Sequence, residues 1–533
     1  MSKKRKINKG EKKLNEPFWL KHPYLIIFAV AFIVHIRAAG FDFVNIDDDE
    51  IILGKYDKIS SLSNVPEAFT SQYGFKESTP YYRPVINLSF FLDAQISGKN
   101  PVGYHVSNII YHLITVSLLF MLMLKFGLDK SISLFVSLLF MVHPLLTNAI
   151  DWIAGRNDLI AGLFCLLSFL YFLKYLTDFT NKNLYLHSLF YLLGIFSKES
   201  VLVLPAACLF YFYLFERRKI TKKILLKLAV IWLIPIIGSQ LLKGVLIHSI
   251  GNVTYGLSAL LDNFRVIPEV ISKVFIPLEI SVLPTFSLVK TILGTAILII
   301  ILLFPVFVRS IDKKKFYFGV FWFFLFLLPG LLVVYSNQGE GFDYLDTRDY
   351  IPVMGIMLSL GTVLSTIKLK TFNLKYMSTG LAVLILLSIL TVIQSNKYQN
   401  GAVFAENAVE SNPGRPFFYQ KLADYYFVHA DYNKAIEYLR QAIRIEPNAF
   451  IFYKNLALAY LHLKQRENAV PVLEKAYELN DKDRDVLNAL VRTNYELHNF
   501  KESFYYLNKV IELGGKVDQH LYETLKALAD KKE

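Results

Sequence analysis

The chain has 533 residues, 54% of them hydrophobic, and a mean hydropathy of +0.39. Soluble domains are about 45–50% apolar, so this composition argues against a soluble protein and indicates a membrane protein. The formal net charge is +13. Its basic residues gather at the N-terminus and between apolar runs, which indicates cytoplasmic loops and no nucleic-acid partner. Cys165 and Cys208 lie inside apolar runs, so we expect no disulfide framework.

Eleven apolar segments predict a bundle of membrane-spanning helices over residues 23–395, since one crossing needs about 20 apolar residues. The first follows a basic N-terminal segment, 1–22, and lacks a small-residue cleavage site, which predicts an uncleaved span. The segment 264–284 contains prolines and charges, so we expect it to be re-entrant or interfacial. The candidate spans are 23–40, 104–124, 131–150, 157–176, 184–197, 200–215, 228–247, 288–308, 316–335, 350–366 and 376–394.

The basic loops predict the orientation of this bundle. With eleven spans and the N-terminus inside, the loops at 217–227, 309–315 and 368–375 all lie in the cytoplasm, as expected for short basic loops. The acidic first loop, 41–103, and the C-terminal domain then lie outside. We therefore expect an integral membrane protein with an extracytoplasmic C-terminal domain, and the short C-terminal repeat array described next favours a bacterial plasma membrane.

The C-terminal domain carries an internal repeat. Ala435, Ala469 and Ser503 are each 34 residues apart, and aromatic and leucine positions share that spacing. This period with small residues at fixed positions is typical of tetratricopeptide repeats, in which stacked helix pairs bury a common face. Three repeats are predicted at 416–449, 450–483 and 484–517, with a capping helix near 518–531 and a linker at 396–415. The fold class is therefore all-α, a polytopic bundle followed by an α-solenoid.

Four consecutive acids, Asp47 to Glu50, directly follow the first span. Membrane proteins keep little charge near the bilayer unless it has a use. Crowded carboxylates raise one another's pKa, which suits a general base, and we take Asp47 and Asp48 as the catalytic candidates. The alternative is that these acids cap a helix over 49–56.

Polar residues near the other outside ends are candidates for substrate binding. His105, Asn108 and His112 share one face of the second span, where they could contact substrate, form a hydrogen-bonded network or hold a divalent metal ion. Cations suit a lipid phosphate, with an aspartate to orient them. Alternatives are an Arg–Asp pair that pins the loop, and lipid-headgroup contact. The substrate-binding candidates are Arg83, His105, Asp151, Arg156, Asp158, Lys198 and Arg348.

Taken in order, these motifs resemble the transmembrane and tetratricopeptide repeat-containing O-mannosyltransferases and their bacterial relatives, of the GT-C glycosyltransferase class. The motifs that carry the resemblance are Phe43-Val44, Asp47-Asp48, Tyr82-Arg83-Pro84, Tyr104-His105, Asn108, His112, His143-Pro144, Gly155-Arg156, Asp158-Leu159, Lys198-Glu199, Arg348 and Tyr350-Ile351-Pro352. The resemblance implies a multi-span fold and a polyprenyl-phosphate-linked sugar donor. It implies that Asp47 is the catalytic carboxylate and that Arg156, Lys198 and Arg348 bind the lipid phosphate. Asn148 and Thr347 stand where acids are expected.

We therefore expect an inverting membrane glycosyltransferase that transfers a sugar to a hydroxyl of a protein or surface glycan presented by the repeats. A non-catalytic scaffold would use the repeats but not Asp47. A transporter of lipid-linked sugars would place charges deep in its spans. No cofactor is implied beyond a divalent metal ion, which stays open.

Overall fold

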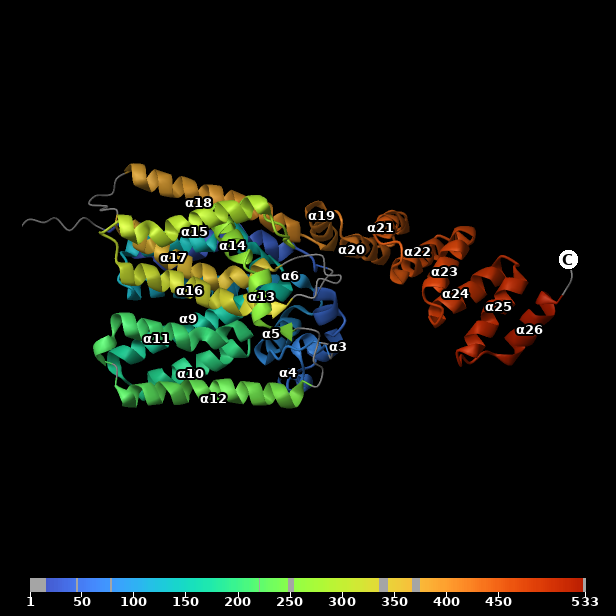
Figure 1. Cartoon of the computed structure of the whole chain (residues 1–533), viewed down its shortest axis with the longest axis horizontal. Helices are drawn as coiled ribbons and strands as arrows, with labels where there is room; N and C mark the ends of the chain where they lie inside the picture. Colours follow the sequence, from blue (N-terminus) through green and yellow to red (C-terminus); the bar gives the residue numbers. More distant parts are fainter. Residues whose placement is uncertain are drawn as a thin grey trace, which may run out of the picture.

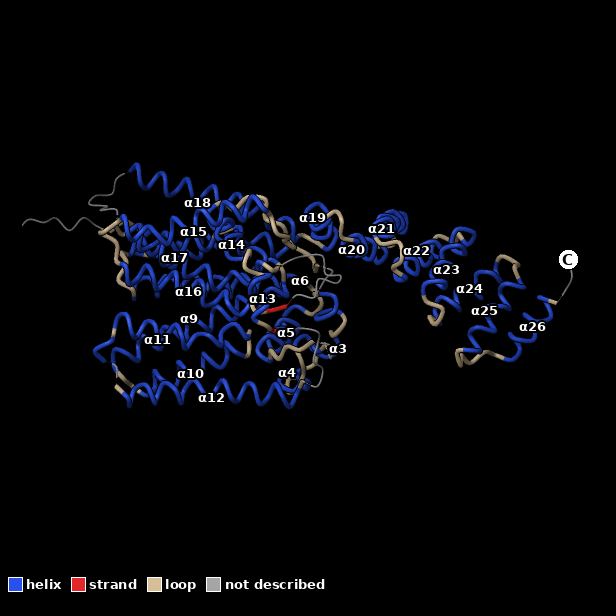
Figure 2. The backbone as a smooth tube through the Cα atoms, in the orientation of Figure 1, coloured by secondary structure: helices blue, strands red, loops and turns tan. Residues whose placement is uncertain are grey.

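The computed structural model describes residues 16–44, 47–76, 79–219, 221–247, 254–334, 344–366 and 374–530. The basic N-terminal residues and most of the loops at 336–349 and 368–375 lie outside these ranges. A bundle of helices forms one part of the molecule, and the repeat array extends from one end of it, which we call the repeat-side end (Figure 1). Helices are almost the only regular secondary structure of the described chain, and loops and turns connect them (Figure 2). The exception is a two-residue antiparallel ladder between β1 (Thr254–Tyr255) and β2 (Val333–Val334), so the all-α prediction is confirmed.

Every segment expected to span the membrane contains a helix. Seven described helices are long and apolar enough to cross. They are Pro23–Gly40 (α2, Pro23–His35, with η1, Ile36–Gly40), α6 (Pro101–Lys125), Ile153–Asp178 (η6, Ile153–Gly155, with α9, Arg156–Asp178), α12 (Lys222–Leu246), α15 (Leu288–Phe307), α16 (Lys313–Leu331) and Met377–Tyr398 (α18, Leu374–Ser395, with η10, Asn396–Tyr398).

The other expected spans are bent or short. The helix α7 (Lys130–Met141) is followed at a 49° bend by Pro144–Asp151, which comprises η5 (Pro144–Leu146) and α8 (Thr147–Asp151). The remaining three are α10 (Asn181–Ile195), Glu199–Phe215 (η7, Glu199–Val203, with α11, Leu204–Phe215) and α17 (Tyr350–Leu364). The described chain thus has seven candidate spans, or eight if the bent pair is one span. The total of eleven stays a prediction.

The segment expected to be re-entrant contains the short helices α13 (Leu257–Asp262) and α14 (Val266–Phe275). Nine of the ten residues of α14 are buried, charged ones included. The helix packs so closely on α15 that a Cβ at Gly294 would lie 1.6 Å from the carbonyl oxygen of Pro268. With ten residues, α14 is too short to cross the bilayer.

The first loop folds over the repeat-side end of the bundle (Figure 1). Its helical segments are η2 (Asp49–Leu53), α3 (Tyr56–Ile59), η3 (Leu62–Asn64), α4 (Glu67–Thr70), η4 (Tyr73–Phe75) and α5 (Pro84–Ser97). Phe90 and Phe91 of α5 pack with Tyr104 of α6 in one buried core. This apolar packing holds the acidic residues of the loop against the bundle.

Three helix pairs form the repeat array. They are α20 (Pro416–Val428) with α21 (Tyr432–Ile445), α22 (Phe450–His462) with α23 (Arg466–Leu479), and α24 (Arg484–Glu496) with α25 (Phe500–Glu512), and α26 (Gln519–Ala529) follows. Ala435, Ala469 and Ser503 are fully buried, so the small residues allow close helix packing. The expected linker holds a further helix, α19 (Gly401–Ser411), whose apolar face is buried.

Candidate functional site

The four acids Asp47 to Glu50, the acidic turn, lie where the first loop meets the bundle. The Asp48 carboxylate is 1% exposed and accepts hydrogen bonds from the backbone N–H groups of Val44, at 3.0 Å, and Ala154, at 3.2 Å. It makes no hydrogen bond that caps η2, in contrast to the capping alternative. Asp48 therefore ties the acidic turn to η6.

Burial raises the pKa of Asp48 to about 8, and the neighbouring Asp47 carboxylate adds to the effect. Its two backbone donors act in the opposite direction, because they favour the charged form. A group with this pKa is largely protonated at neutral pH. Its geometry and its protonation state both suit a supporting role better than that of a free base.

Asp47 is the accessible member of the pair. Its side chain is 35% exposed, and its Oδ1 lies 3.4 Å from the ammonium group of Lys76. Lys76 also pairs with Glu50 at 2.5 Å. Partial burial raises the pKa of Asp47, whereas the charge of Lys76 lowers it. An accessible carboxylate can accept a proton from a hydroxyl group.

Arg83 lies next to the acidic turn but is already paired. Its guanidinium donates to Glu199 Oε2 at 2.8 and 3.3 Å. It also stacks on the rings of Tyr73, at 5.1 Å, and Tyr81, at 4.3 Å. Tyr73 receives a hydrogen bond from Asn157 at 3.1 Å, so these contacts connect the first loop to η7 and α9.

A second set of charges continues from Glu199 across the repeat-side ends of α9, α14 and α17. Lys198 Nζ donates to Asp158 Oδ2 at 2.5 Å, and Lys273 of α14 pairs with Asp346 at 2.6 Å. Burial raises the pKa of Asp349, and the nearby Asp346 and Asp158 carboxylates raise it further. We call this set, with Arg83 and Arg348, the charged network. Its members are Arg83, Asp158, Lys198, Glu199, Lys273, Asp346, Arg348 and Asp349.

Arg156 and Asp93 form a buried ion pair elsewhere. The Arg156 guanidinium has no exposed surface and donates to Asp93 Oδ2 at 2.5 Å, to Ser89 Oγ at 3.2 Å and to the carbonyl oxygen of Tyr104 at 3.0 Å. This geometry favours the Arg–Asp alternative over a phosphate ligand, with Asp93 as the partner instead of Asp151 or Asp158.

The polar face of α6 is buried in the bundle. The Asn108 amide donates to the carbonyl oxygen of Ile150 at 3.0 Å, and His112 Nδ1 lies 2.7 Å from the Tyr350 hydroxyl. His105 is 1% exposed and packs edge-on against Phe41. For Asn108 and His112 these contacts favour the hydrogen-bonded network over substrate contact.

Asp151 is buried beside Ser395 of α18. Within the described ranges, no group of three or more His, Cys, Asp or Glu side chains is arranged to hold a metal ion.

Several members of the site were not predicted. Lys76 lies 29 positions from its partner Asp47, and neither the spacing nor the composition of the loop marks it. Lys273 had a usable signal, since a charge in an otherwise apolar stretch indicates a buried partner. Asp346 and Asp349 flank the predicted Arg348, so the late motif carries more charge into the network than its arginine alone.

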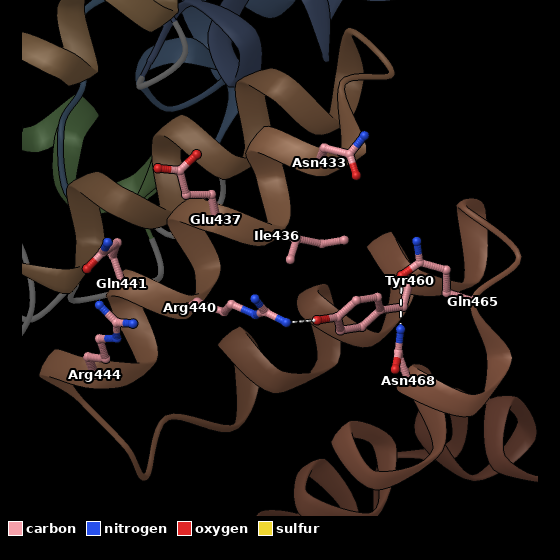
Figure 3. Close-up of a pocket in the computed structure, with 9 residues that line it drawn as sticks. All are labelled: Asn433, Ile436, Glu437, Arg440, Gln441, Arg444, Tyr460, Gln465 and Asn468. Carbon is pink, nitrogen blue, oxygen red and sulfur yellow. Dashed lines mark hydrogen bonds between the residues drawn. The ribbon is translucent and has the colours of Figure 1, made fainter.

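The repeat array contains a polar pocket of about 390 Å³. Arg440 of α21 points across it and donates to the Tyr460 hydroxyl at 2.5 Å, while Asn468 donates to Gln465 at 3.1 Å (Figure 3). The pocket is lined by Asn433, Ile436, Glu437, Arg440, Gln441, Arg444, Tyr460, Gln465 and Asn468. Its amides and guanidinium groups can bind an extended polar chain.

Residues 80–239 match the family model of the dolichyl-phosphate-mannose-protein mannosyltransferases. Residues 418–449 and 452–483 match the tetratricopeptide repeat model. Human protein O-mannosyl-transferase TMTC4 is 32% identical over 198 residues, and human TMTC3 is 40% identical over 89 residues. Protein O-mannosyl-transferase tmtc2 of Xenopus laevis is 30% identical over 155 residues.

These matches cover parts of each chain. They span 34%, 17% and 28% of the present chain, and 26%, 10% and 18% of the respective relatives. The chain thus spans about a quarter or less of the length of the curated relatives that it matches. The family match extends from just before α5 into α12, and the matched range includes Arg83, Asp158 and Lys198. The resemblance predicted from the sequence is confirmed: the chain combines a mannosyltransferase-like domain with tetratricopeptide repeats, and it is similar to protein O-mannosyl-transferases.

Proposed function

We propose that this protein is an inverting membrane glycosyltransferase that transfers a sugar from a polyprenyl-phosphate donor to an acceptor hydroxyl on the extracytoplasmic side. The observation that carries the proposal is the Asp47 carboxylate, exposed over 35% of its surface in a crowded acidic turn. The similarity of residues 80–239 to mannosyltransferases supports a mannose-type sugar.

In this reaction Asp47 is the general base. It accepts the proton of the acceptor hydroxyl while that oxygen forms a bond to C1 of the sugar. The bond between C1 and the phosphate oxygen breaks, and the polyprenyl phosphate leaves with the bonding electrons. Attack opposite the leaving group inverts the anomeric centre. Asp48, held by two backbone N–H groups, keeps the turn in place.

The donor phosphate is the proposed ligand of the charged network. Lys198 is 14% exposed and Arg83 9%, so both cations lie at the surface of a largely desolvated region. Each already has a carboxylate partner, which gives a phosphate two ways to bind: by adding to the pair or by displacing the carboxylate. The same cations stabilise the negative charge that develops on the leaving phosphate.

The orientation follows from the loops. The C-terminal ends of α11 and α15 lie at the end of the bundle opposite the repeat array (Figure 1), and the basic residues 217–219 and 313–315 follow them. Short basic loops stay in the cytoplasm, which supports an extracytoplasmic site and repeat array. In this orientation the repeats recruit a protein or glycan acceptor, and the polar pocket around Arg440 is the proposed contact.

The test is the release of free polyprenyl phosphate from a panel of polyprenyl-phosphate sugars by the full chain in lipid. We expect release by the wild type and a loss of at least about a hundredfold in Asp47→Asn, the usual range for a general base. The matched control is Glu50→Gln, which removes an acid of the same turn that also pairs with Lys76.

Equal activity of Asp47→Asn and wild type would refute the assignment of Asp47. No release from any donor, with and without acceptor extract, would favour a scaffold that uses the repeats alone. Glu50→Gln should retain most of the activity, because its carboxylate is 60% exposed and is not required to accept the proton.

A further inference from the structure

The first helices of the repeat array are part of the same core as the acidic turn. Phe404 of α19 and Phe418 of α20 are buried in one cluster with Phe43, Val44 and Ile51 of the first loop. Phe404 also lies 6.0 Å from Trp152, two residues before the Ala154 N–H that binds Asp48. The array is therefore packed against the residues that position the acids.

Hydrogen bonds fix this arrangement at several points. The backbone N–H of Asp42 donates to the carbonyl oxygen of Gln399 at 2.9 Å. The Asn412 amide donates to the carbonyl oxygen of Leu283 at 3.0 Å, and Asn407 Oδ1 accepts from the N–H of Val282 at 3.3 Å. These contacts come from both sides of α19, which leaves little freedom for α20 to rotate away.

Lys421 lies on the face of α20 that this packing turns toward the acidic turn. It follows the buried Phe418 by three positions, so both side chains share one helix face. Its ammonium lies 5.5 Å from the centre of the Phe417 ring, which restricts the side chain. The charge of Lys421 lowers the pKa of Asp47 and of Asp49, in agreement with this placement.

We propose that the repeat array supplies part of the reaction site, and that Lys421 on its first helix is a positioning residue for the acidic turn. The array is then more than a recruitment device, because its docking brings a cation to the proposed base. Lys421 and Lys76 approach the turn from different elements. An acceptor hydroxyl reaches Asp47 beside the first helix of the array.

The acidic turn is surrounded by several titratable or charged groups. Asp42, Glu50, Lys76 and Lys421 act on the pKa of Asp47 or Asp49, and Asp47 in turn acts on the pKa of Asp48 and Tyr73. Two of them are cations, so removal of Lys421 leaves Lys76 to oppose the carboxylates alone. Loss of the nearby positive charge favours the protonated form of Asp47 and Asp49, and their titration moves to higher pH.

The experiment measures the protonation of the carboxylates directly. A water-soluble carbodiimide with an amine nucleophile labels protonated carboxyl groups, and mass spectrometry of the full chain in lipid gives the rate at each residue against pH. In Lys421→Met we expect labelling of Asp47 and Asp49 on the alkaline side of their titration to rise about threefold, as for the loss of one partly solvated unit charge. Lys421→Arg should restore the wild-type profile.

The matched control is Lys434→Met on α21. The ammonium group of Lys434 also lies over an aromatic ring, 4.5 Å from the centre of Tyr426, and it pairs with Asp431 Oδ2 at 3.8 Å. This variant should leave the labelling of Asp47 unchanged, and Asp57 in α3 serves as an internal reference. Superimposable profiles for Lys421→Met and wild type would overturn the proposal. An equal rise in the labelling of Asp57 in Lys421→Met would also overturn it, since that result indicates general opening of the loop.

The role of Lys421 in sugar transfer rests on the proposed function, but the result of the carbodiimide labelling does not. If the wild type transfers sugar, the acid limb of its pH–rate profile should move upward in Lys421→Met and return in Lys421→Arg. If no donor is used, the proposed function fails, while the labelling still decides whether Lys421 acts on the acidic turn. If the labelling shifts but the acid limb does not move, Lys421 acts on the acidic turn, whereas the assignment of Asp47 as the base fails.

Discussion

The buried ion pair between Arg156 and Asp93 offers the sharpest test of the site's organisation. If it pins the loop, loss of either partner should destabilise the bundle. If Arg156 instead binds the donor phosphate, its loss should weaken donor binding at unchanged stability. The variants are Asp93→Ala, Arg156→Met and the double variant.

The expected magnitude follows from the contacts. The pair is 0% and 2% exposed, and Asp93 also accepts from Ser107 at 2.6 Å. Removing one partner of a buried pair costs about 3–5 kcal/mol, because the other charge stays buried and unpaired. The double variant should cost less than the sum of the singles by about 2 kcal/mol, since it leaves no lone charge. This is a large fraction of a typical stability of about 5–15 kcal/mol.

The assay is equilibrium unfolding of the full chain in mixed micelles, followed by tryptophan fluorescence. The control is Arg492→Met, which breaks an ion pair whose arginine side chain is 82% exposed, and we expect a cost below about 1 kcal/mol. Strictly additive single variants, or a stable Arg156→Met that loses donor affinity alone, would refute the pinning role.

Three further outcomes are expected. Gly155→Ala should lower both stability and transfer, because the new Cβ would lie 2.6 Å from the carbonyl oxygen of Asn148. Gly155 follows Ala154, whose N–H binds Asp48. Equilibrium unfolding and polyprenyl phosphate release test this prediction, and wild-type values for both would contradict it. Burial raises the pKa of Asp47 above its ordinary value near 4, so this base ionises only at higher pH. The rate of transfer should therefore fall on the acid side at a pH above about 4. A transfer rate that stays unchanged down to about pH 3 would exclude Asp47 as the base. Arg440→Met should raise the acceptor KM severalfold at unchanged kcat, and an unchanged KM would remove the pocket from the acceptor path.

Much of the architecture could be predicted because it depends on local patterns. Apolar runs of about 20 residues and a 34-residue period report burial directly, and both the bundle and the repeats follow from them. The bent pair α7–α8 and the 15-residue helices are less predictable, since hydropathy does not show where a helix ends inside a bundle.

The residue types of the site were also predictable, but their pairing was not. The sequence predicts that Asp47, Arg156 and Lys198 lie near the same membrane face. It does not show that Arg156 is buried against Asp93, 63 positions away, or that Lys198 meets Asp158. Ion pairs between distant segments depend on how helices pack, and packing is set by contacts that no local period records.

The class of molecule, the acidic turn and the repeat array can be predicted from the amino-acid sequence, because hydrophobicity, charge and periodicity are properties of neighbouring residues. Which acid is accessible, which cations are already paired and where the array docks depend on the folded structure. The reason is physical: the exposed fraction of Asp47 and the approach of Lys421 arise from segments far apart in the chain that bury a common apolar core.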